Sequence, residues 1–536
     1  ASFIPSYNST MFARPTDEVE ITNILRDLRN CAPGCDDISP ALLKESSPNV
    51  VSILTHLVNV SLLQGIFPDE LKVAKVKPLF KSGEKLSVNN YRPISLLPAF
   101  SKIFEKCMAN RLLEFLSEHN IFYKYQFGFR PKHSTNIALH LLVDKITDSL
   151  DRNYAFVGVA LDFRKAFDTI NFPVLLAKMH KYGIRGVTHD WFTSYLYGRR
   201  QYVQLGRVQS ESLEIQCGVP QGSILGPLLF LLYINDLPSA TQLLPIIFAD
   251  DTSLFSCERT VEDCIAKINL EMESLLKWIR SNKLSLNIDK TNYIIFSKSA
   301  RGAIRTASTA YPPVTIDGIP IKHVHSIKFL GVFIDDRLSW HEHVRFVRGK
   351  VSRSLGVLRR AQQFINRDTL ISLYYSFIYP YLNYCIDVWG HCAEHLFNSL
   401  FILQKSAIRI INSAGRRSHT APLFTSMNIL PLRNVYFYSI SLFMFKFYSR
   451  LLPIVVDELF QCNASIHNVR TRQANLLHVP RIHTNISKKS IRHRGVLVWN
   501  QIPRQIDPHT SLICFKKSLK TILLSDTNPF ILHIVQ

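Results

Sequence analysis

Two adjacent carboxylates, Asp250 and Asp251, lie between two short apolar runs of the sequence. The runs, residues 244–248 and 252–255, have the composition of buried strands, so we expect a hairpin with the aspartates at its tip. Like charges this close repel unless a cation lies between them, and carboxylate oxygens are ligands that Mg²⁺ prefers. A solvated turn is the ordinary explanation of an isolated Asp-Asp pair, so the metal-site hypothesis depends on the rest of the chain.

A third carboxylate follows another apolar run. Residues 154–161 predict a buried strand that ends at Asp162, and Phe167 follows five residues later. A carboxylate at the end of a buried strand is energetically costly unless it binds something. Asp162 is therefore the expected partner of Asp250 and Asp251, because a divalent site takes carboxylates from separate strands.

Basic and glycine-rich segments supply groups that suit a phosphate-bearing substrate. Residues 73–80 and 91–96 predict the strands of a second hairpin, with Lys81 and Arg92 on its two arms. A mobile ammonium and a rigid guanidinium fork together suit a triphosphate, although each alone would be an ordinary surface charge. Residues 216–227 contain three glycines and two prolines ahead of an apolar helix, which indicates a loop that approaches a ligand closely.

The elements that must position these residues are predicted from the spacing of apolar side chains. Helices are expected near residues 17–30, 49–63, 104–115, 137–146, 228–234 and 265–279, and further strands near 293–296 and 327–334. The segment from about 344 to 460 is expected to be mainly helical. With 536 residues, the chain is long enough for three or four modules.

The charge balance points to a polyanionic partner. Lys plus Arg number 63 against 41 Asp plus Glu, a net charge of +22, which is typical of proteins that bind nucleic acid. The surplus is concentrated in a basic amphipathic helix near 344–360 and in residues 463–536, which include Arg470 and Arg472. Such a helix could lie on a membrane, but we favour a nucleic-acid backbone because no apolar anchor is nearby. No apolar run reaches the 18 or so residues of a membrane span, so no membrane partner is expected.

Seven sequence blocks, in this order, resemble the reverse transcriptases of non-LTR retrotransposons, the LINE-type elements of the jockey and CR1 groups. They are Lys75-Val-Lys-Pro-Leu-Phe-Lys-Ser-Gly with Tyr91-Arg-Pro-Ile-Ser-Leu-Leu, Gln126-Phe-Gly-Phe-Arg-Pro, Leu161-Asp-Phe-Arg-Lys-Ala-Phe-Asp, Gly218-Val-Pro-Gln-Gly-Ser-Ile-Leu-Gly-Pro, Phe248-Ala-Asp-Asp, Lys290-Thr and Lys328-Phe-Leu-Gly. The resemblance extends from about residue 31 to 335 and more weakly to the end. One departure is Asp37, which stands where the family has glycine and puts the local turn in doubt.

The resemblance implies an α+β fold, the right-hand polymerase. This fold has fingers, a palm built on an antiparallel sheet of the RRM or ferredoxin-like kind, and a helical thumb. Accordingly, residues 1–70 would be lead-in helices packed on the fingers and residues 71–334 the fingers and palm. Residues 335–430 would form the thumb, and residues 431–536 a basic C-terminal region.

The resemblance also implies the catalytic groups. Asp162 and Asp250 would hold two Mg²⁺ ions, for which Mn²⁺ could substitute, and Asp251 would support the metal at the primer end. Lys290 would protonate the leaving pyrophosphate. Carboxylates are hard oxygen ligands, so Mg²⁺ suits the site better than a softer metal.

The remaining implied site residues contact the nucleotide, the primer or the nucleic acid. Those expected at the nucleotide are Lys81 and Arg92 on the triphosphate, Phe167 as a steric gate beneath the sugar, and Phe163, Gln221 and Gly222 around the pocket. Those expected to position the primer end are Phe329, Leu330 and Gly331. Those expected on the nucleic acid are Arg130, Arg345, Arg348 and Arg353.

The implied partners are an RNA template, a DNA primer or target DNA, and dNTPs. Elements of this kind carry an endonuclease ahead of the polymerase, and nothing before residue 31 could be one, so the chain is expected to be part of something longer. The scattered cysteines indicate an intracellular protein, which would act in the nucleus on chromosomal DNA and could form a cytoplasmic ribonucleoprotein. The alternatives are a maturase-like or telomerase-like host enzyme, and a catalytically decayed remnant that only binds RNA.

Overall fold

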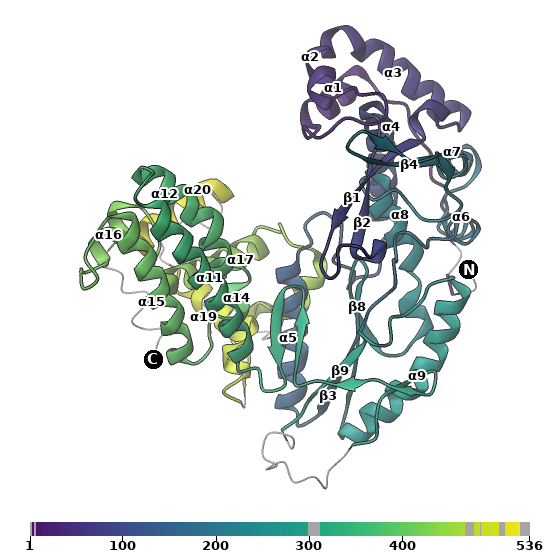
Figure 1. The fold of residues 1–536 in the computed structure, drawn as a ribbon. Helices are drawn as coiled ribbons and strands as arrows, with labels where there is room; N and C mark the ends of the chain where they lie inside the picture. Colours follow the sequence, from purple (N-terminus) through teal and green to yellow (C-terminus); the bar gives the residue numbers. More distant parts are fainter. Residues whose placement is uncertain are drawn as a thin grey trace.

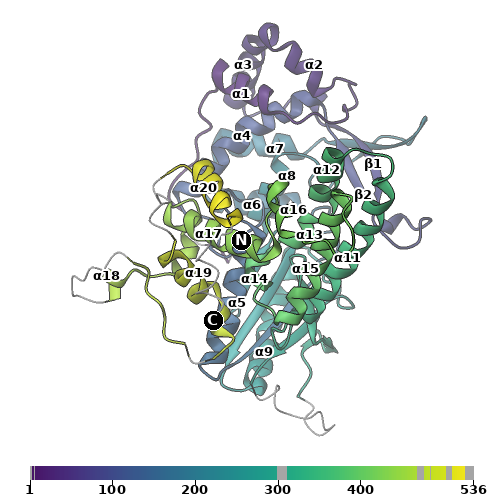
Figure 2. The ribbon, with the colours of Figure 1, turned by 90° about the vertical axis from the view of Figure 1, so that its left-hand side faces the viewer.

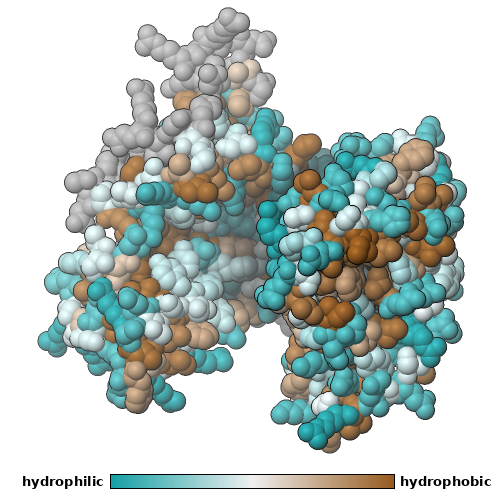
Figure 3. Space-filling view, turned by 90° about the horizontal axis from the view of Figure 1, so that it is seen from above, coloured by the Kyte–Doolittle hydropathy of each residue, from teal (hydrophilic) through white to brown (hydrophobic). Residues whose placement is uncertain are grey.

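The chain forms two bodies that lie side by side (Figure 1). The computed structural model describes residues 3–4, 7–298, 311–466, 476–482, 484–502 and 510–525. One body contains the sheets and the N-terminal helices, and the other is almost entirely helical. Seen from above, the surface is hollowed between the helical body on the left and the body of the N-terminal helices on the right (Figure 3).

A central five-stranded sheet organises the first body. Its strand order is β7-β8-β3-β9-β12, and β3 pairs antiparallel with both β8 and β9. The strands are β3 (Ala155–Leu161), β7 (Leu244–Phe248), β8 (Asp251–Glu258), β9 (Asn292–Phe296) and β12 (Lys322–His323). Successive residues of β3 enter different hydrophobic clusters, Phe156 on the side of α5 (Thr135–Asp151) and Val157 on the side of α9 (Val261–Ser281), because strand side chains alternate between faces.

The upper part of this body contains a second sheet and a layer of helices. The strands are β1 (Val73–Phe80), β2 (Tyr91–Leu96), β4 (Arg200–Leu205), β5 (Val208–Gln209) and β6 (Leu213–Glu214). The helices of the body besides α5 and α9 are α1 (Glu18–Asp27), α2 (Pro40–Glu45), α3 (Ser47–Gln64), α4 (Ala99–Glu118), α6 (Phe172–Lys181), α7 (Gly186–Leu196) and α8 (Leu225–Ile234), with 3₁₀ turns η1 (Asp69–Leu71), η2 (Val88–Asn90) and η3 (Leu237–Ala240). A short hairpin, β10 (Thr315–Ile316) with β11 (Ile319–Pro320), packs near α9.

The second body stands in front of the central sheet when the molecule is turned by 90° (Figure 2). The hairpin of β13 (Ser326–Phe329) and β14 (Val332–Asp335) leads into it. Its helices are α11 (His341–Ala361), α12 (Arg367–Phe377), α13 (Tyr379–Asn383), α14 (Ile386–Trp389), α15 (Glu394–Ile411), α16 (Ala421–Ser426), α17 (Leu432–Tyr448), α18 (Asn463–Ile466), α19 (Ile491–Asn500) and α20 (Leu512–Leu524), with 3₁₀ turns η4 (Ile454–Leu459) and η5 (Ser487–Lys489).

Two helices near the C-terminus pack into the helical body. Helices α19 and α20 both contact α17, and Phe445 of α17 stacks on Phe515 of α20 with ring centroids 4.1 Å apart. Part of the basic charge is used internally, because Arg492 forms an ion pair with Asp144 of α5 at 2.9 Å. Arg470 and Arg472 lie outside the described residues.

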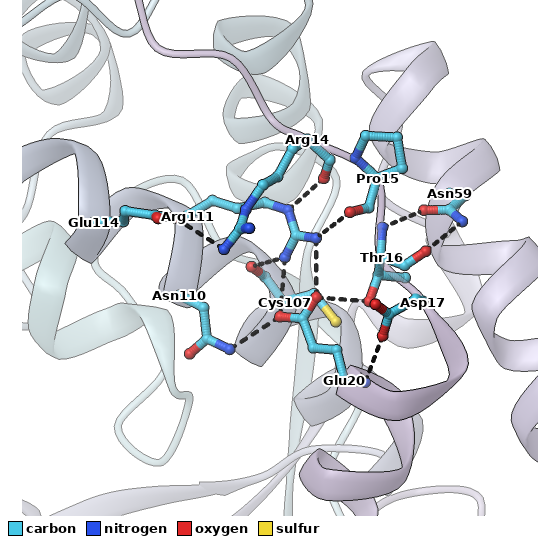
Figure 4. A network of polar contacts seen from close by, with 10 residues as sticks. All are labelled: Arg14, Pro15, Thr16, Asp17, Glu20, Asn59, Cys107, Asn110, Arg111 and Glu114. Atoms are coloured by element: carbon cyan, nitrogen blue, oxygen red, sulfur yellow. Dashed lines mark hydrogen bonds and ion pairs between the residues drawn. The ribbon is translucent and has the colours of Figure 1, made fainter.

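A buried arginine fastens the N-terminal segment to α4 (Figure 4). Arg111 donates to the backbone carbonyl oxygens of Arg14 and Pro15 and pairs with the Glu20 carboxylate at 3.0 Å. A planar guanidinium can satisfy several acceptors at once, which suits a segment without regular hydrogen bonds of its own. The segment that precedes α1 is thus held in place before the first helix begins.

The predicted elements agree with the structure at most positions. Strands β1 and β2 have the predicted limits, and the helices near 17–30, 49–63, 137–146 and 265–279 correspond to α1, α3, α5 and α9. Asp37, the residue that departs from the sequence block, adopts a φ of 54°, in the left-handed region. Aspartate tolerates this region better than most residues with a Cβ. None of the helices in the described part of the chain is long and apolar enough to cross a membrane.

Candidate active site

The paired aspartates lie at the tip of a hairpin, as the sequence predicts. Phe248 at the end of β7 pairs with Asp251 at the start of β8, which leaves Ala249 and Asp250 as the two residues of the turn. Ala249 has a φ of 57° and is buried. A tight turn of this kind brings both carboxylates to one edge of the sheet.

Asp162 reaches the same edge from the neighbouring strand. The register of β3 against β8 ends with Leu161 opposite Thr252, so the next step along both strands sets Asp162 level with Asp251. The Asp162 carbonyl oxygen accepts a hydrogen bond from the Asn287 backbone N–H at 2.7 Å. This bond attaches the loop of residues 285–291, which carries the exposed side chain of Lys290, to the end of β3.

The electrostatics of Asp251 report on the crowding of these carboxylates. Its pKa is raised from the ordinary value by burial, and then by the negative charges of Asp250 and Asp162, whereas Lys81 lowers it. Two neighbouring carboxylates therefore act on Asp251, and one lysine opposes them. A hard divalent cation would offset these negative charges, and carboxylate oxygens are the ligands that Mg²⁺ prefers. In the described part of the chain, however, no three or more His, Cys, Asp or Glu side chains are grouped so that they could hold a metal ion as they stand.

Lys81 and Arg92 lie on the two arms of the β1–β2 hairpin. Leu79 pairs with Arg92, and the Lys81 backbone N–H donates to the Asn90 carbonyl oxygen at 2.8 Å. Both basic side chains are exposed. The hairpin thus presents one ammonium and one guanidinium group, and Lys81 is close enough to Asp251 to lower its pKa.

The glycine-rich loop is bonded to the turn that follows β3. The N–H groups of Gly218 and Val219 donate to the carbonyl oxygens of Ile170 and Phe167 at 2.8 and 3.0 Å. A Cβ on Gly218 would lie 2.6 Å from the Asp168 carbonyl oxygen, which explains the need for glycine there. The loop and the turn therefore form one unit beside the carboxylates.

Gln221 is held within this loop by two hydrogen bonds. Its side-chain amide donates to the Asp168 carboxylate at 2.8 Å, and its carbonyl oxygen accepts from the Ser95 N–H of β2 at 2.8 Å. A Cβ on the next residue, Gly222, would lie 2.5 Å from the Ser95 carbonyl oxygen. The loop therefore joins the β1–β2 hairpin to the central sheet.

The two phenylalanines of the block that contains Asp162 differ in exposure. Phe167 is half-buried and stacks on Phe230 of α8 with ring centroids 4.4 Å apart. The side chain of Phe163 is buried in the core, so only its backbone can face a nucleotide. Of these two side chains, Phe167 is thus the one that remains partly accessible to solvent.

The β13–β14 hairpin has a two-residue turn of Leu330 and Gly331, because Phe329 pairs with Val332. Both turn residues have positive φ, 46° and 86°. The hydroxyl of Tyr384, from the helical body, donates to the Leu330 carbonyl oxygen at 2.6 Å. Tyr384 therefore supports this hairpin, a contact that the sequence did not predict.

The arginines expected on nucleic acid fall into two groups. Arg130 donates to the carbonyl oxygens of Tyr123 and Gln126, and burial lowers its pKa to about 10. Arg345, Arg348 and Arg353 are exposed on α11, and no ion pair among the described residues involves them. The α11 arginines are thus available to a polyanion, whereas Arg130 is largely engaged with its own loop.

One buried acid beneath the loop was missed by sequence reasoning. The Glu105 carboxylate of α4 accepts from the N–H groups of Ile224 and Leu225 at 2.7 and 3.1 Å, at the start of α8. Burial raises its pKa, and the Arg199 charge opposes that shift. A charged residue within the apolar run of α4 was the signal that could have identified it.

Comparisons with known proteins match much of this chain to one family of enzymes. Residues 80–334 match the family of the reverse transcriptase (RNA-dependent DNA polymerase). The chain is 29% identical over 408 residues to the probable RNA-directed DNA polymerase from transposon X-element of Drosophila melanogaster, over 74% of this chain and 44% of the relative. It is 28% identical over 409 residues to the RNA-directed DNA polymerase from mobile element jockey of the same species, again over 74% and 44%.

A more distant relative is the Pol polyprotein from type-1 retrotransposable element R2 of Popillia japonica, 24% identical over 338 residues, 60% of this chain and 45% of the relative. The chain spans less than half the length of these relatives. Residues 80–334 form a reverse transcriptase domain. This match and the names of the relatives confirm the resemblance found in the sequence.

Proposed function

We propose that this chain is an RNA-directed DNA polymerase that adds deoxynucleotides to a primer 3′-hydroxyl on an RNA template. The observation that carries the proposal is the position of Asp162, Asp250 and Asp251 at one edge of the central sheet, where burial and then the charges of Asp250 and Asp162 raise the pKa of Asp251. Such a set of carboxylates suits nucleotidyl transfer better than a solvated turn.

The chemistry divides between bound metal and protein groups. Two Mg²⁺ ions held by these carboxylates would lower the pKa of the primer hydroxyl and stabilise charge on the leaving group. Lys81 and Arg92 bind the triphosphate with fixed positive charge. Lys290 donates a proton to the pyrophosphate, a role supported by the attachment of its loop to Asp162.

Positioning of the substrates falls to three further elements. Phe167 lies beneath the sugar, with the Phe163 backbone, Gln221 and Gly222 completing the nucleotide pocket. The β13–β14 hairpin, through Phe329, Leu330 and Gly331, holds the primer end. The exposed arginines of α11 follow the duplex, and Arg130 supports the loop behind the site.

In this proposal the central sheet is the palm, the β1–β2 hairpin belongs to the fingers, and α1 to α3 are lead-in helices that pack on the fingers. Helices α11 to α16 belong to the thumb, residues 335–430, and α17 to α20 belong to the basic C-terminal region, residues 431–536. The partners are an RNA template, a DNA primer or target, and dNTPs, with an endonuclease encoded elsewhere in the element. The protein would act in the nucleus, with a cytoplasmic ribonucleoprotein as an earlier stage.

The test is extension of a labelled DNA primer on an RNA template with dNTPs and Mg²⁺ or Mn²⁺. Wild-type protein should extend the primer, and Asp250→Ala and Asp162→Ala should abolish extension because the metals lose a ligand. Both variants should still bind primed template, since the basic surfaces are unchanged. Binding is measured by fluorescence anisotropy on the same substrate.

Asp190→Ala serves as the matched control, because Asp190 is an exposed aspartate of α7. It should extend primers as wild type does. Normal extension by Asp250→Ala would refute the site assignment. Absence of extension by wild-type protein that still binds primed template would favour the decayed, RNA-binding alternative.

A further inference from the structure

The free edge of β7 is covered by the segment that contains Gln126. Strand β7 pairs with β8 on one side, and on the other the Phe127 N–H donates to the Ile247 carbonyl oxygen at 2.8 Å. The Ile247 N–H donates in turn to the Tyr125 backbone carbonyl oxygen at 3.0 Å. Residues 125–127 thus run alongside the strand that leads directly to Asp250.

The side chain of Gln126 continues this contact into the turn itself. Its Oε1 accepts from the Ala249 N–H at 3.1 Å and from the Gly128 N–H at 2.9 Å, and the residue is only 2% exposed. The first N–H of a two-residue hairpin turn has no partner in the strand ladder. Ala249 is buried, so Gln126 supplies an acceptor that the hairpin lacks.

The turn needs such support because its backbone is strained. Ala249 has a φ of 57°, a region that residues with a Cβ rarely adopt and that persists only where surroundings enforce it. The backbone of Gly128 lies close to the same residue: a Cβ on Gly128 would be only 2.4 Å from the Ala249 nitrogen. One segment therefore restrains the turn by a hydrogen bond and by close backbone contact.

We propose that Gln126 is a positioning residue, whose Oε1 fixes the Ala249 turn and so directs the Asp250 and Asp251 carboxylates toward the divalent metal. This inference rests on the proposed function, since it assigns those carboxylates to metal binding. It adds a residue that touches neither metal nor substrate. Groups that orient metal ligands typically change metal affinity or activity by about 10- to 100-fold when removed.

The test compares Gln126→Met with Gln404→Met. Gln404 of α15 is a matched control, because it is equally buried and its Oε1 accepts the Leu432 N–H at 2.8 Å in the helical body. Mn²⁺ binding to the full chain is measured by electron paramagnetic resonance without nucleotide, together with thermal melting and primer extension. Both substitutions remove a buried acceptor, but only Gln126→Met should weaken Mn²⁺ binding, by about 10-fold or more.

Raising the Mn²⁺ concentration should restore much of the extension rate of Gln126→Met. Gly128→Ala perturbs the same turn independently and should weaken Mn²⁺ binding as well, which covers the case in which Gln126→Met does not fold. The inference would be overturned if Gln126→Met lowered the melting temperature as much as Gln404→Met does while its Mn²⁺ affinity stayed at the wild-type value. Gln126 would then have only a structural role.

The outcomes also separate this inference from the proposed function. If wild-type protein binds Mn²⁺ through Asp250 but extends no primer, the polymerase proposal fails while the effect of Gln126→Met on Mn²⁺ binding still decides the positioning role. If wild-type protein extends primers and Gln126→Met matches it in Mn²⁺ affinity, the positioning role alone fails.

Discussion

The ring of Phe167 is held by two other aromatic rings and remains partly accessible to solvent. It stacks on Phe230 and meets Phe129 edge-on, with centroids 6.2 Å apart. The Val219 N–H bonds its carbonyl oxygen, so backbone and ring are both constrained. A rigid ring five residues past Asp162 suits the role of a steric gate, because it cannot yield to an added 2′-hydroxyl.

Phe167→Val should keep dNTP incorporation and gain rNTP incorporation. The smaller side chain leaves room for the hydroxyl, whereas the ring forces a ribonucleotide out of line, and a 1 Å displacement can reduce the rate ~10²-fold. Single-nucleotide kcat/KM for each dNTP and rNTP pair measures the change. Phe167→Tyr, which keeps the ring, should retain the preference. Unchanged discrimination in an active Phe167→Val would show that another residue is the gate.

At the scale of elements, the sequence predicted strands and helices better than their contacts. The apolar run ending at Asp162 and the period of α9 are local signals, and both were predicted correctly. The pairing of residues 162–164 with 285–287 joins segments more than a hundred residues apart, and no local pattern encodes it. Likewise, Asp168 meets Gln221 and Tyr384 meets Leu330 only through the folded chain.

The basic face of α11 gives an element-scale prediction. Reversing the charge of Arg345, Arg348 and Arg353 to glutamate should weaken binding to primed template and shorten products. Each lost phosphate contact lowers the slope of log affinity against log salt by ~0.7 to 0.9. Anisotropy titrations between low and high salt measure this slope.

The matched control reverses three exposed basic residues at the opposite end of the central sheet, Arg152, Arg259 and Lys298. These changes alter the net charge equally but lie away from the carboxylates. If the control variant lost as much affinity for primed template as the α11 variant, with an equal change in the salt slope, only net charge would matter. In that case α11 would not contact the duplex.

At the scale of the whole molecule, α5 joins the central sheet to the helical body. Its residues at successive turns contact three different segments beyond the sheet. These pairs are His140 with Asp387 at 3.0 Å, Asp144 with Arg492 at 2.9 Å, and the Thr147 carbonyl oxygen with Ser487 at 3.2 Å. Because one helix face carries all three, the two bodies share a polar joint as well as a hydrophobic cluster.

This joint predicts a pH dependence of stability. Burial raises the pKa of Asp144 to about 6, although Arg492 opposes the shift. A carboxyl group whose pKa is higher in the folded than in the unfolded protein stabilises the folded state at pH values below the unfolded pKa. That contribution is lost as the pH rises through about 6, the pKa in the folded state. Relative to Asp144→Asn, wild-type protein should therefore lose up to about 3 kcal/mol between pH 4 and pH 7.

Thermal melting of both proteins across this range measures the difference, with Asp190→Asn as the control. The control should track wild type at every pH, because Asp190 is an exposed residue of α7. A constant gap between wild-type protein and Asp144→Asn would mean that Asp144 is ionised throughout and stabilised by Arg492 alone.

The segment ahead of α1 has a consequence for the order in which the chain is completed. The N–H groups of Tyr7 and Met11 donate to the carbonyl oxygens of Lys181 and Gly183, and a Cβ on Gly183 would lie 2.2 Å from the Ser9 carbonyl oxygen. Partners separated by some 170 residues are synthesised roughly 10 to 35 s apart on a ribosome. During that interval the earlier segment lacks these acceptors, so it cannot dock there until residue 183 has been synthesised, and meanwhile it is exposed to chaperones and proteases on the nascent chain.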